Sequence, residues 1–438
     1  MKEYKVLICR FSHYSWLLNK LLEMKIIAVL SLLTLVSCQS GHKVFSPDYE
    51  VKQENDSLYI EDFSQYWTTI NESFAYFNTQ KTNWEKVREL YQPMIDTVSG
   101  RNSFITLLEK CNNELYNGHV GLNTNIESSS KLIPSSTDIW LVKKDGGYII
   151  ESIRENSKIE TSKLTLGMKV LKFNGKSIHE AIKEFLPKSF SNYDDRVYEF
   201  AANTLIAGKH NIERIITVSL DGKEEIIPLP YSNTEDYYSD DELLTYKTLE
   251  NNIGFIRINN SLWNNKLISA FDDALDSLSN TSSLILDLRE TPSGGNNTIA
   301  KAIMGKFIQE EAPYQRYRYV YDEKETGIEQ YWVEQVMPRE SPYTKPMVLL
   351  VGRWTGSMGE GITIGFDSFE NVEIVGTELA DLLGVVWGYT LDNSKIGFQI
   401  PGIRLYHMNK SPREDFVPSH YFNNNSDCLK KAIELLSK

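Results

Sequence analysis

Residues 352–360 read GRWTGSMGE and place a serine where a nucleophile could work. They follow the apolar run MVLLV, which predicts a buried strand, and residues from Met358 to Phe369 predict a helix. A nucleophilic serine needs room for a substrate carbonyl and a backbone N–H that can hold the oxyanion. Ser357 meets this description, but serine and glycine are also common in turns and at helix N-caps, so the turn alone leaves both interpretations open.

A second glycine-rich turn follows another apolar run. SLILDLR, residues 283–289, predicts a strand that leads through TPSGGNN into a helix at TIAKAIMGKF. Functional groups of α/β sheets collect where the strands end. We therefore expect the N–H of Met358 and the N–H of Gly294 or Gly295 to converge on one oxyanion. Glu360 is either a supporting carboxylate or a favourable charge at a helix start.

A serine nucleophile also needs a base. The chain has 7 histidines, and their positions alone do not select one. His119 lies in NGHVGL at the end of a helical stretch, and Glu414 in KSPREDFVP is a carboxylate that could orient an imidazole. The histidines are too scattered to suggest zinc, and HExxH, phosphate-binding loops and GxGxxG are missing from the sequence. We therefore expect no metal and no cofactor.

The whole chain limits the class of protein. It has 438 residues, 41% of them hydrophobic and 24% charged, which is typical of a globular protein with two or three domains. The net charge is −13 and basic clusters are missing, which argues against a nucleic-acid partner. Without a CxxC motif, we expect Cys111 and Cys428 to be buried thiols, although they could also pair in an oxidising compartment.

The first 58 residues read as export and tethering segments. From Met24 the sequence MKIIAVLSLLTLVSCQS has a positive start, a short apolar core and a small residue before Cys38. LVSC resembles the lipobox of bacterial lipoproteins, although a cysteine can follow an apolar run by chance. We expect residues 1–23 to be a misread start, 24–37 a lipoprotein signal peptide, and 38–58 a tether from a lipid on Cys38. The protein would then be anchored in the cell envelope, on its periplasmic or extracellular face.

Three regions must position the chemical groups. Helical periodicity in NWEKVRELYQPMI and SFITLLEKCNNELYN predicts an N-terminal helical domain over residues 59–132. Strand–helix alternation over residues 233–438, with strands at IGFIRI, SLILDLR, MVLLV and VEIVG, predicts a mainly parallel sheet covered by helices.

Residues 133–232 read as a β-rich domain. DIWLVKKDGGYIIESI predicts a hairpin around Asp145-Gly146-Gly147, and LGMKVLKFNG followed by a helix at IHEAIKEFL resembles a PDZ domain. Met168 stands where PDZ domains usually carry an acidic residue, and a generic small β-domain is the alternative. PDZ domains bind extended chain ends at a sheet edge.

The order of the motifs NGHVGL, PDZ-like region, LILDLRETPSGGN, TGSMGE and PREDFVP resembles the serine peptidase family of the C-terminal processing (tail-specific) peptidases and the tricorn core. The resemblance runs from about residue 60 to the end and implies a catalytic domain with a ClpP/crotonase-like α/β fold. It implies Ser357 as nucleophile and Gly294 or Gly295 with Met358 as the oxyanion hole.

The resemblance also distinguishes two branches by their base. The processing peptidases use a lysine after the serine, and GTELADLLGVV at residues 376–386 has none. His119 and Glu414 match the base and the orienting carboxylate of the tricorn-like branch. Two positions depart from the family: Gly118 stands where that branch has a serine, and Ser419 where the family usually has an aspartate.

The implied function is a serine endopeptidase that cleaves peptides or unfolded or tail segments of proteins in the bacterial envelope through an acyl-enzyme. Its partners would be peptides or unfolded proteins and, through Cys38, the membrane; the oligomeric state stays open. The main alternative is a catalytically weak peptide-binding scaffold with the same fold. A crotonase-like acyl-transfer protein rests on fold analogy alone.

Overall fold

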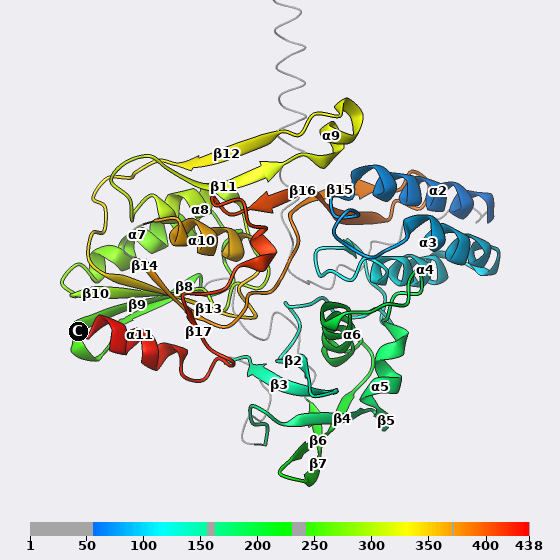
Figure 1. The fold of residues 1–438 in the computed structure, drawn as a ribbon, viewed down its shortest axis with the longest axis horizontal. Helices are drawn as coiled ribbons and strands as arrows, with labels where there is room; N and C mark the ends of the chain where they lie inside the picture. Colours follow the sequence, from blue (N-terminus) through cyan, green and yellow to red (C-terminus); the bar gives the residue numbers. More distant parts are fainter. Residues whose placement is uncertain (1–55, 156–162, 230–241, 370–371, 438) are drawn as a thin grey trace, which may run out of the picture. The chain divides into compact units, whose positions relative to one another are not determined.

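The computed structural model describes residues 56–155, 163–229, 242–369 and 372–437 (Figure 1). The predicted signal peptide, the lipidation residue Cys38 and most of the tether lie outside these residues, as does the predicted domain boundary at residue 232. Among the helices that are described, none combines the length and the apolar character needed to cross a membrane.

The N-terminal region is helical, as its periodicity predicts. It contains α2 (Asp56–Ser73), α3 (Trp84–Tyr91) and α4 (Arg101–Asn113), with a 3-10 turn at Gln92–Thr97 after α3. The side chain of Asn83 caps α3 by accepting from the N–H of Lys86 at 3.0 Å. Cys111 is buried in α4 and Cys428 is buried elsewhere, and both thiols are free, which confirms the expectation of unpaired cysteines.

The helices share their core with the C-terminal half of the chain. The strands β1 (Gly121–Leu122), β16 (Gly397–Tyr406), β11 (Ala312–Arg318) and β12 (Tyr331–Val336) form one sheet, with β15 (Val385–Thr390) paired to β16 and α9 (Val320–Thr326) between β11 and β12. Leu383, Leu391, Ile396, Phe398 and Ile400 belong to the same buried cluster as the residues of α2 to α4. The helical region therefore holds the turn at residues 117–121 against a strand from the other end of the chain.

The β-rich region is a single antiparallel sheet with the order β2-β3-β4-β6-β7. The predicted hairpin is confirmed as β2 (Ile139–Lys144) and β3 (Gly147–Ile153), and β4 (Lys169–Phe173), β5 (Lys176–Ser177), β6 (Arg214–Leu220) and β7 (Lys223–Leu229) follow. The helix α6 (Asp195–Ala207) packs on β2. The predicted helix at IHEAIKEFL is shorter than expected: α5 spans Ile178–Ala181 and a 3-10 turn ends at Glu184, because Pro187 disfavours helical backbone just before it.

The C-terminal region is the predicted parallel sheet with helices over it. Its order is β17-β14-β13-β10-β9-β8, formed by β8 (Leu244–Thr248), β9 (Ile253–Ile258), β10 (Ser283–Asp287), β13 (Met347–Val351), β14 (Val372–Gly376) and β17 (His420–Tyr421), and only β8 is antiparallel to its neighbour. The helices α7 (Leu267–Ser277), α8 (Asn297–Met304) and α10 (Met358–Asp367) share the core on one face, and α11 (Cys428–Leu436) covers the other (Figure 1).

Buried ion pairs join the β-rich region to the parallel sheet. The carboxylate of Glu151 on β3 binds the guanidinium of Arg353 at 2.7 and 2.9 Å, just after β13. Arg154 binds Glu290 at 2.8 Å, again with both side chains almost fully buried. A charge pair removed from water is costly to break, because the partner that remains is left uncompensated. The contacts therefore hold the two regions in one arrangement.

We expect Arg353→Ala to lower the free energy of unfolding by about 3–5 kcal/mol, because it leaves the buried carboxylate of Glu151 without its cation. Lys183→Ala is the control, since Lys183 and Glu180 form a pair of exposed side chains whose loss should cost roughly 0.5 kcal/mol or less. Urea denaturation of both variants checks the difference. Equal, small effects would contradict the structural role of the buried pair.

Candidate active site

Ser357 lies in the turn between β13 and α10, as the sequence predicts. Its backbone has φ 52° and ψ −107°, a region that a residue with a side chain rarely adopts. Strain of this kind is typical of the sharp strand-to-helix turns that expose a nucleophilic serine. The N–H of Ser357 donates to Oε2 of Glu360 at 2.8 Å, so the carboxylate helps to hold the turn in its strained form.

Gly294 lies directly against Ser357. A Cβ atom on Gly294 would stand 2.3 Å from Cβ of Ser357, 2.6 Å from its Oγ and 3.1 Å from the backbone nitrogen of Met358. Gly294 also has φ 68°, which favours glycine. The structure therefore brings together Gly294, Ser357 and Met358. Gly295 instead packs on Leu262, whose carbonyl oxygen would lie 2.1 Å from an added Cβ, so Gly294 is the glycine of the pair that lies against Ser357; its N–H donates to the Thr291 carbonyl at 3.5 Å.

His119 is buried in the turn that follows α4. Its Nδ1 lies 2.6 Å from the carbonyl oxygen of Leu383, so Nδ1 carries the proton and Nε2 has a free lone pair. Within the described residues, Nε2 has no hydrogen-bond partner. The pKa of His119 is lowered to about 4, mainly by burial and also by the nearby Arg413 guanidinium, while the hydrogen bond to the Leu383 carbonyl acts in the opposite direction. The imidazole is therefore neutral at pH 7, as a general base must be.

The segment at residues 377–384 connects the His119 turn to the Ser357 helix. The side chain of Asn117 accepts from the N–H of His119 at 2.9 Å and of Leu383 at 3.3 Å, and donates to the carbonyl of Asp381 at 3.0 Å. On the other side, the N–H of Leu382 donates to Oε1 of Glu360 at 3.1 Å. This segment lies within residues 376–386, where the sequence lacks the lysine of the processing peptidases. It instead supplies a backbone carbonyl that orients the candidate base.

Glu360 and Arg413 form a buried pair beside Ser357. Nη2 of Arg413 lies 3.2 Å from Oε2 of Glu360, and its Nη1 donates to the carbonyl of Ser357 at 3.2 Å. Burial raises the pKa of Glu360 to about 7, although Arg413 and the two backbone donors favour the ionised form. Sequence reasoning passed over Arg413, although it lies in the quoted PREDFVP motif; an arginine next to a singled-out acid was the available signal.

Among the described residues, no hydrogen bond or ion pair joins Glu414 to His119. Both residues are described, and the partner of the His119 Nδ1 is the Leu383 carbonyl. Glu414 lies in a 3-10 turn, Arg413–Asp415, in which successive side chains point in different directions, and Arg413 is the one that points to Ser357. Burial raises the pKa of Glu414, against nearby Arg196, Arg413 and Arg404. The orienting role of Glu414 therefore stays a prediction.

Packing and pairing account for both departures from the family pattern. A Cβ on Gly118 would lie 2.4 Å from the carbonyl oxygen of Ile133 and 2.8 Å from Cδ2 of Leu382. The other methyl group of Leu382 would lie 3.1 Å from a Cβ on Gly356, so Leu382 packs on the residues that precede His119 and Ser357. Ser419 exchanges hydrogen bonds with the backbone of Ile374, at 3.1 and 3.0 Å, and so helps to attach β17 to β14.

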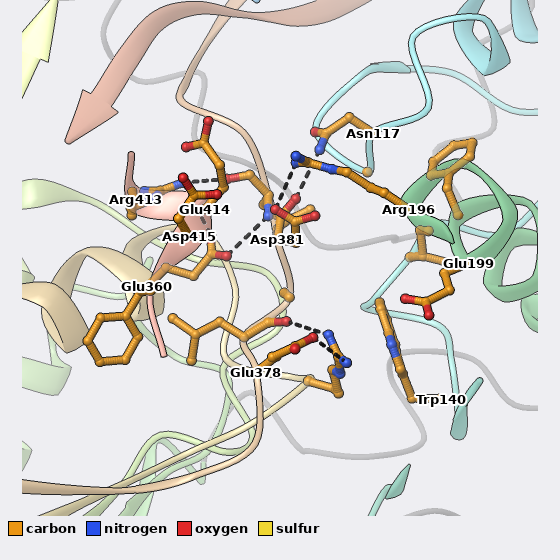
Figure 2. A pocket seen from close by; sticks show the side chains of 18 of the residues that line it. Asn117, Trp140, Arg196, Glu199, Glu360, Glu378, Asp381, Arg413, Glu414 and Asp415 are labelled. Carbon is orange, nitrogen blue, oxygen red and sulfur yellow. Dashed lines mark hydrogen bonds and ion pairs between the residues drawn. The ribbon is translucent and has the colours of Figure 1, made fainter. Parts of the chain in front are cut away.

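A cavity of about 320 Å³ lies beside these residues (Figure 2). Its lining includes Gly118, Glu360 and Leu382, and also charged residues from α6 and from the 413–417 segment. In the described part of the chain, this cavity included, no three His, Cys, Asp or Glu side chains are grouped closely enough to hold a metal ion.

We expect Gly118→Ser to lower stability by about 1–3 kcal/mol, because the added side chain must displace the Ile133 carbonyl or Leu382. Gly121→Ser is the matched control: Gly121 begins β1 three residues further along the chain, and its nearest neighbour would be 3.8 Å from the added Cβ. Thermal unfolding checks the pair. A stable Gly118→Ser variant would show that the missing hydroxyl is not excluded by packing.

We expect His119 to stay neutral, with the proton on Nδ1, down to about pH 4. Because the pKa is lowered in the folded protein, its contribution to stability is present above the ordinary value of 6.5 and is lost as the pH falls towards 4. NMR of ¹⁵N-labelled imidazole follows both features, with His119→Gln to assign the signals. Titration near 6.5 would contradict the buried, unpaired Nε2.

Two segments of the chain match known peptidase families. Residues 252–415 match the model of peptidase family S41, and residues 59–111 match the tricorn protease C1 domain. No curated protein matches the sequence. The first match contains Ser357, Gly294, Met358 and Glu414, and the second ends shortly before His119.

Solved structures share the fold at low sequence identity. Mature CPAF in complex with lactacystin is 13% identical, with a TM-score of 0.60 over 87% of this chain and 98% of that chain. The photosystem II D1 C-terminal processing protease is 14% identical, with a TM-score of 0.55 over 87% and 97%. A putative peptidase from Parabacteroides merdae is 13% identical, with a TM-score of 0.53 over 87% and 97%.

At these identities the structural similarity shows the fold alone, and the family matches carry the assignment. The C-terminal half of this mixed α/β chain is similar to peptidase family S41, a segment similar to the tricorn protease C1 domain precedes it, and the protein is a serine-type peptidase.

Proposed function

We propose that this protein is an endopeptidase that cleaves peptides or unfolded and tail segments of proteins through an acyl-enzyme. The observation that carries the proposal is the strained Ser357 turn packed against Gly294 and the N–H of Met358. A buried, neutral His119 with an unpaired Nε2, linked to that turn through Leu382 and Glu360, supports it.

In the proposed mechanism, Oγ of Ser357 gives its proton to Nε2 of His119 and attacks the scissile carbonyl. The N–H groups of Met358 and Gly294 donate to the oxyanion, and His119 then protonates the leaving amine. Water, with His119 again as base, releases the acyl group from Ser357. The Leu383 carbonyl keeps the imidazole in the required tautomer throughout.

The imidazolium that forms in each step needs a negative charge nearby. The Leu383 carbonyl supplies only a dipole, and Arg413 opposes the positive charge. We propose that Glu414 keeps the stabilising role that the family resemblance implies. Its carboxyl would have to turn from the cavity towards His119 when substrate is bound.

Three further features belong to this proposal. The catalytic sheet would have the ClpP/crotonase-like fold, and the β2–β7 sheet with α6 would act as a PDZ-like domain that gathers an extended chain end. The signal-like segment before Cys38 supports lipid anchoring in a bacterial envelope. Substrates would then be proteins exposed at that membrane.

A peptide-binding scaffold with weak turnover is the second candidate. The lowered pKa of His119, to about 4, favours it, because an imidazole of low pKa is a weak proton acceptor. The two candidates differ only in turnover, so both predict that extended peptides bind.

We expect Ser357→Ala in the full chain to lose cleavage by at least roughly a thousandfold, because the acyl-enzyme cannot form. Ser368→Ala, at the other end of α10, should keep both fold and activity. Incubation with unfolded protein and a peptide library, followed by mass spectrometry, checks cleavage, and circular dichroism checks the fold. Cleavage that survives in Ser357→Ala would remove Ser357 from the mechanism, and peptide binding without cleavage by the wild type would favour the scaffold.

A further inference from the structure

The cavity beside the candidate active site lies where three regions of the chain meet. Its walls come from the turn at residues 116–118, from Trp140 on β2 with the α6 residues 196–200, and from segments 378–382 and 413–417 of the C-terminal region (Figure 2). A volume of about 320 Å³ is large enough for one long side chain and the backbone around it.

Each arginine of the cavity is already neutralised by a carboxylate. Arg196 binds Asp381 at 2.8 Å, and Arg413 lies 3.2 Å from Glu360. Arg353 is bound to Glu378 at 2.7 Å as well as to the buried Glu151 behind it. These guanidinium groups are therefore committed to the protein's own acids.

Within the described residues, three carboxylates of the cavity remain without a cation: Glu199, Glu414 and Asp415. Glu199 on α6 accepts only the backbone N–H of Lys143, at 2.9 Å, and neither Glu199 nor Glu414 forms an ion pair with any described residue. Burial raises the pKa of Glu199 to about 7 and also raises that of Glu414. Burial is the main cause of both shifts, so a cationic ligand placed here would stabilise the ionised carboxylates.

Trp140 supplies a second, independent indication of a ligand. Its side chain lines the cavity and is only 6% exposed, and its indole N–H has no hydrogen-bond partner within the described residues. An unpaired buried donor is costly unless a ligand brings an acceptor. A free amine carries no acceptor, whereas a peptide carries carbonyl oxygens. The apolar parts of Phe200, Leu382 and Val417 could cover a methylene chain.

We propose that this cavity binds a basic residue of a peptide, with its ammonium or guanidinium group at Glu199 and a peptide carbonyl at the indole N–H of Trp140. Because Gly118, Glu360 and Leu382 also line the cavity, a residue bound here would lie next to the scissile bond. The proposal that the cavity determines cleavage specificity rests on the proposed peptidase function. The proposal that it binds a basic residue does not.

Binding can be tested without turnover in the full-length Ser357→Ala protein. Two blocked pentapeptides that differ only in lysine or norleucine at the central position are titrated by calorimetry. We expect the lysine peptide to bind about tenfold more tightly, since it gains a charge-assisted hydrogen bond. Glu199→Gln, which keeps the acceptor for the Lys143 N–H, should remove most of this preference. Asp195→Asn, on the exposed side of the same helix, should retain it.

Equal affinity for the two peptides, or a lysine preference unchanged in a stably folded Glu199→Gln protein, would overturn the proposal. Cadaverine tests for a free amine as ligand: displacement of the lysine peptide at equal concentration would also overturn it. Lysine-selective binding, together with a wild-type protein that cleaves nothing, would keep the pocket and remove the peptidase function. Cleavage without lysine-selective binding would keep the peptidase function and remove the pocket.

Discussion

The candidate site depends on the hydrogen bond between Nδ1 of His119 and the carbonyl of Leu383, at 2.6 Å. It sets the tautomer of the imidazole. It also joins a turn of the N-terminal helical region to the segment whose Leu382 N–H bonds to Glu360, at the start of the Ser357 helix. A backbone carbonyl on a buried segment cannot rotate away as a side chain can. The candidate base is therefore positioned by the docking of two regions, and the shared core of α2 to α4 with β15 and β16 stabilises that docking.

The site concentrates acids that are kept partly neutral by burial. The pKa is raised to about 7 in Glu360 and Glu199 and to about 6 in Asp381, in each case mainly by removal from water. Such groups hold protons in the folded chain that the unfolded chain releases. Their contribution to stability is present below the ordinary pKa near 4 and is lost as the pH rises through 6 and 7. Arginines at 196, 353 and 413 limit this cost by pairing with neighbouring carboxylates.

Much of the fold could be predicted because its elements carry local signals. The apolar runs of β9, β10, β13 and β14, the hairpin at Asp145-Gly146 and the periodicity of α3 and α4 all appear where the sequence places them. The pairing of β1 with β16, which joins the N-terminal region to the C-terminal region, could not be predicted. It uses backbone groups that every residue possesses, so no residue type marks it in the sequence. For the same reason, the Leu383 carbonyl gave no signal, and the position of Glu414 relative to His119 had to be taken from the family resemblance.

By itself, the sequence determined where the candidate nucleophile turn lies and which glycine-rich turn lies beside it. Serine between glycines after an apolar strand, and a glycine pair after a second strand, require close backbone approach, and Gly294 does lie against Ser357. Only the tertiary structure decided which side chains surround these two turns. Packing of Leu382 and the Ile133 carbonyl excludes a side chain at Gly118, and the 3-10 turn at Arg413–Asp415 directs Arg413, rather than Glu414, to Ser357. These outcomes depend on the space and direction available after regions far apart in the chain have packed, which no local pattern records.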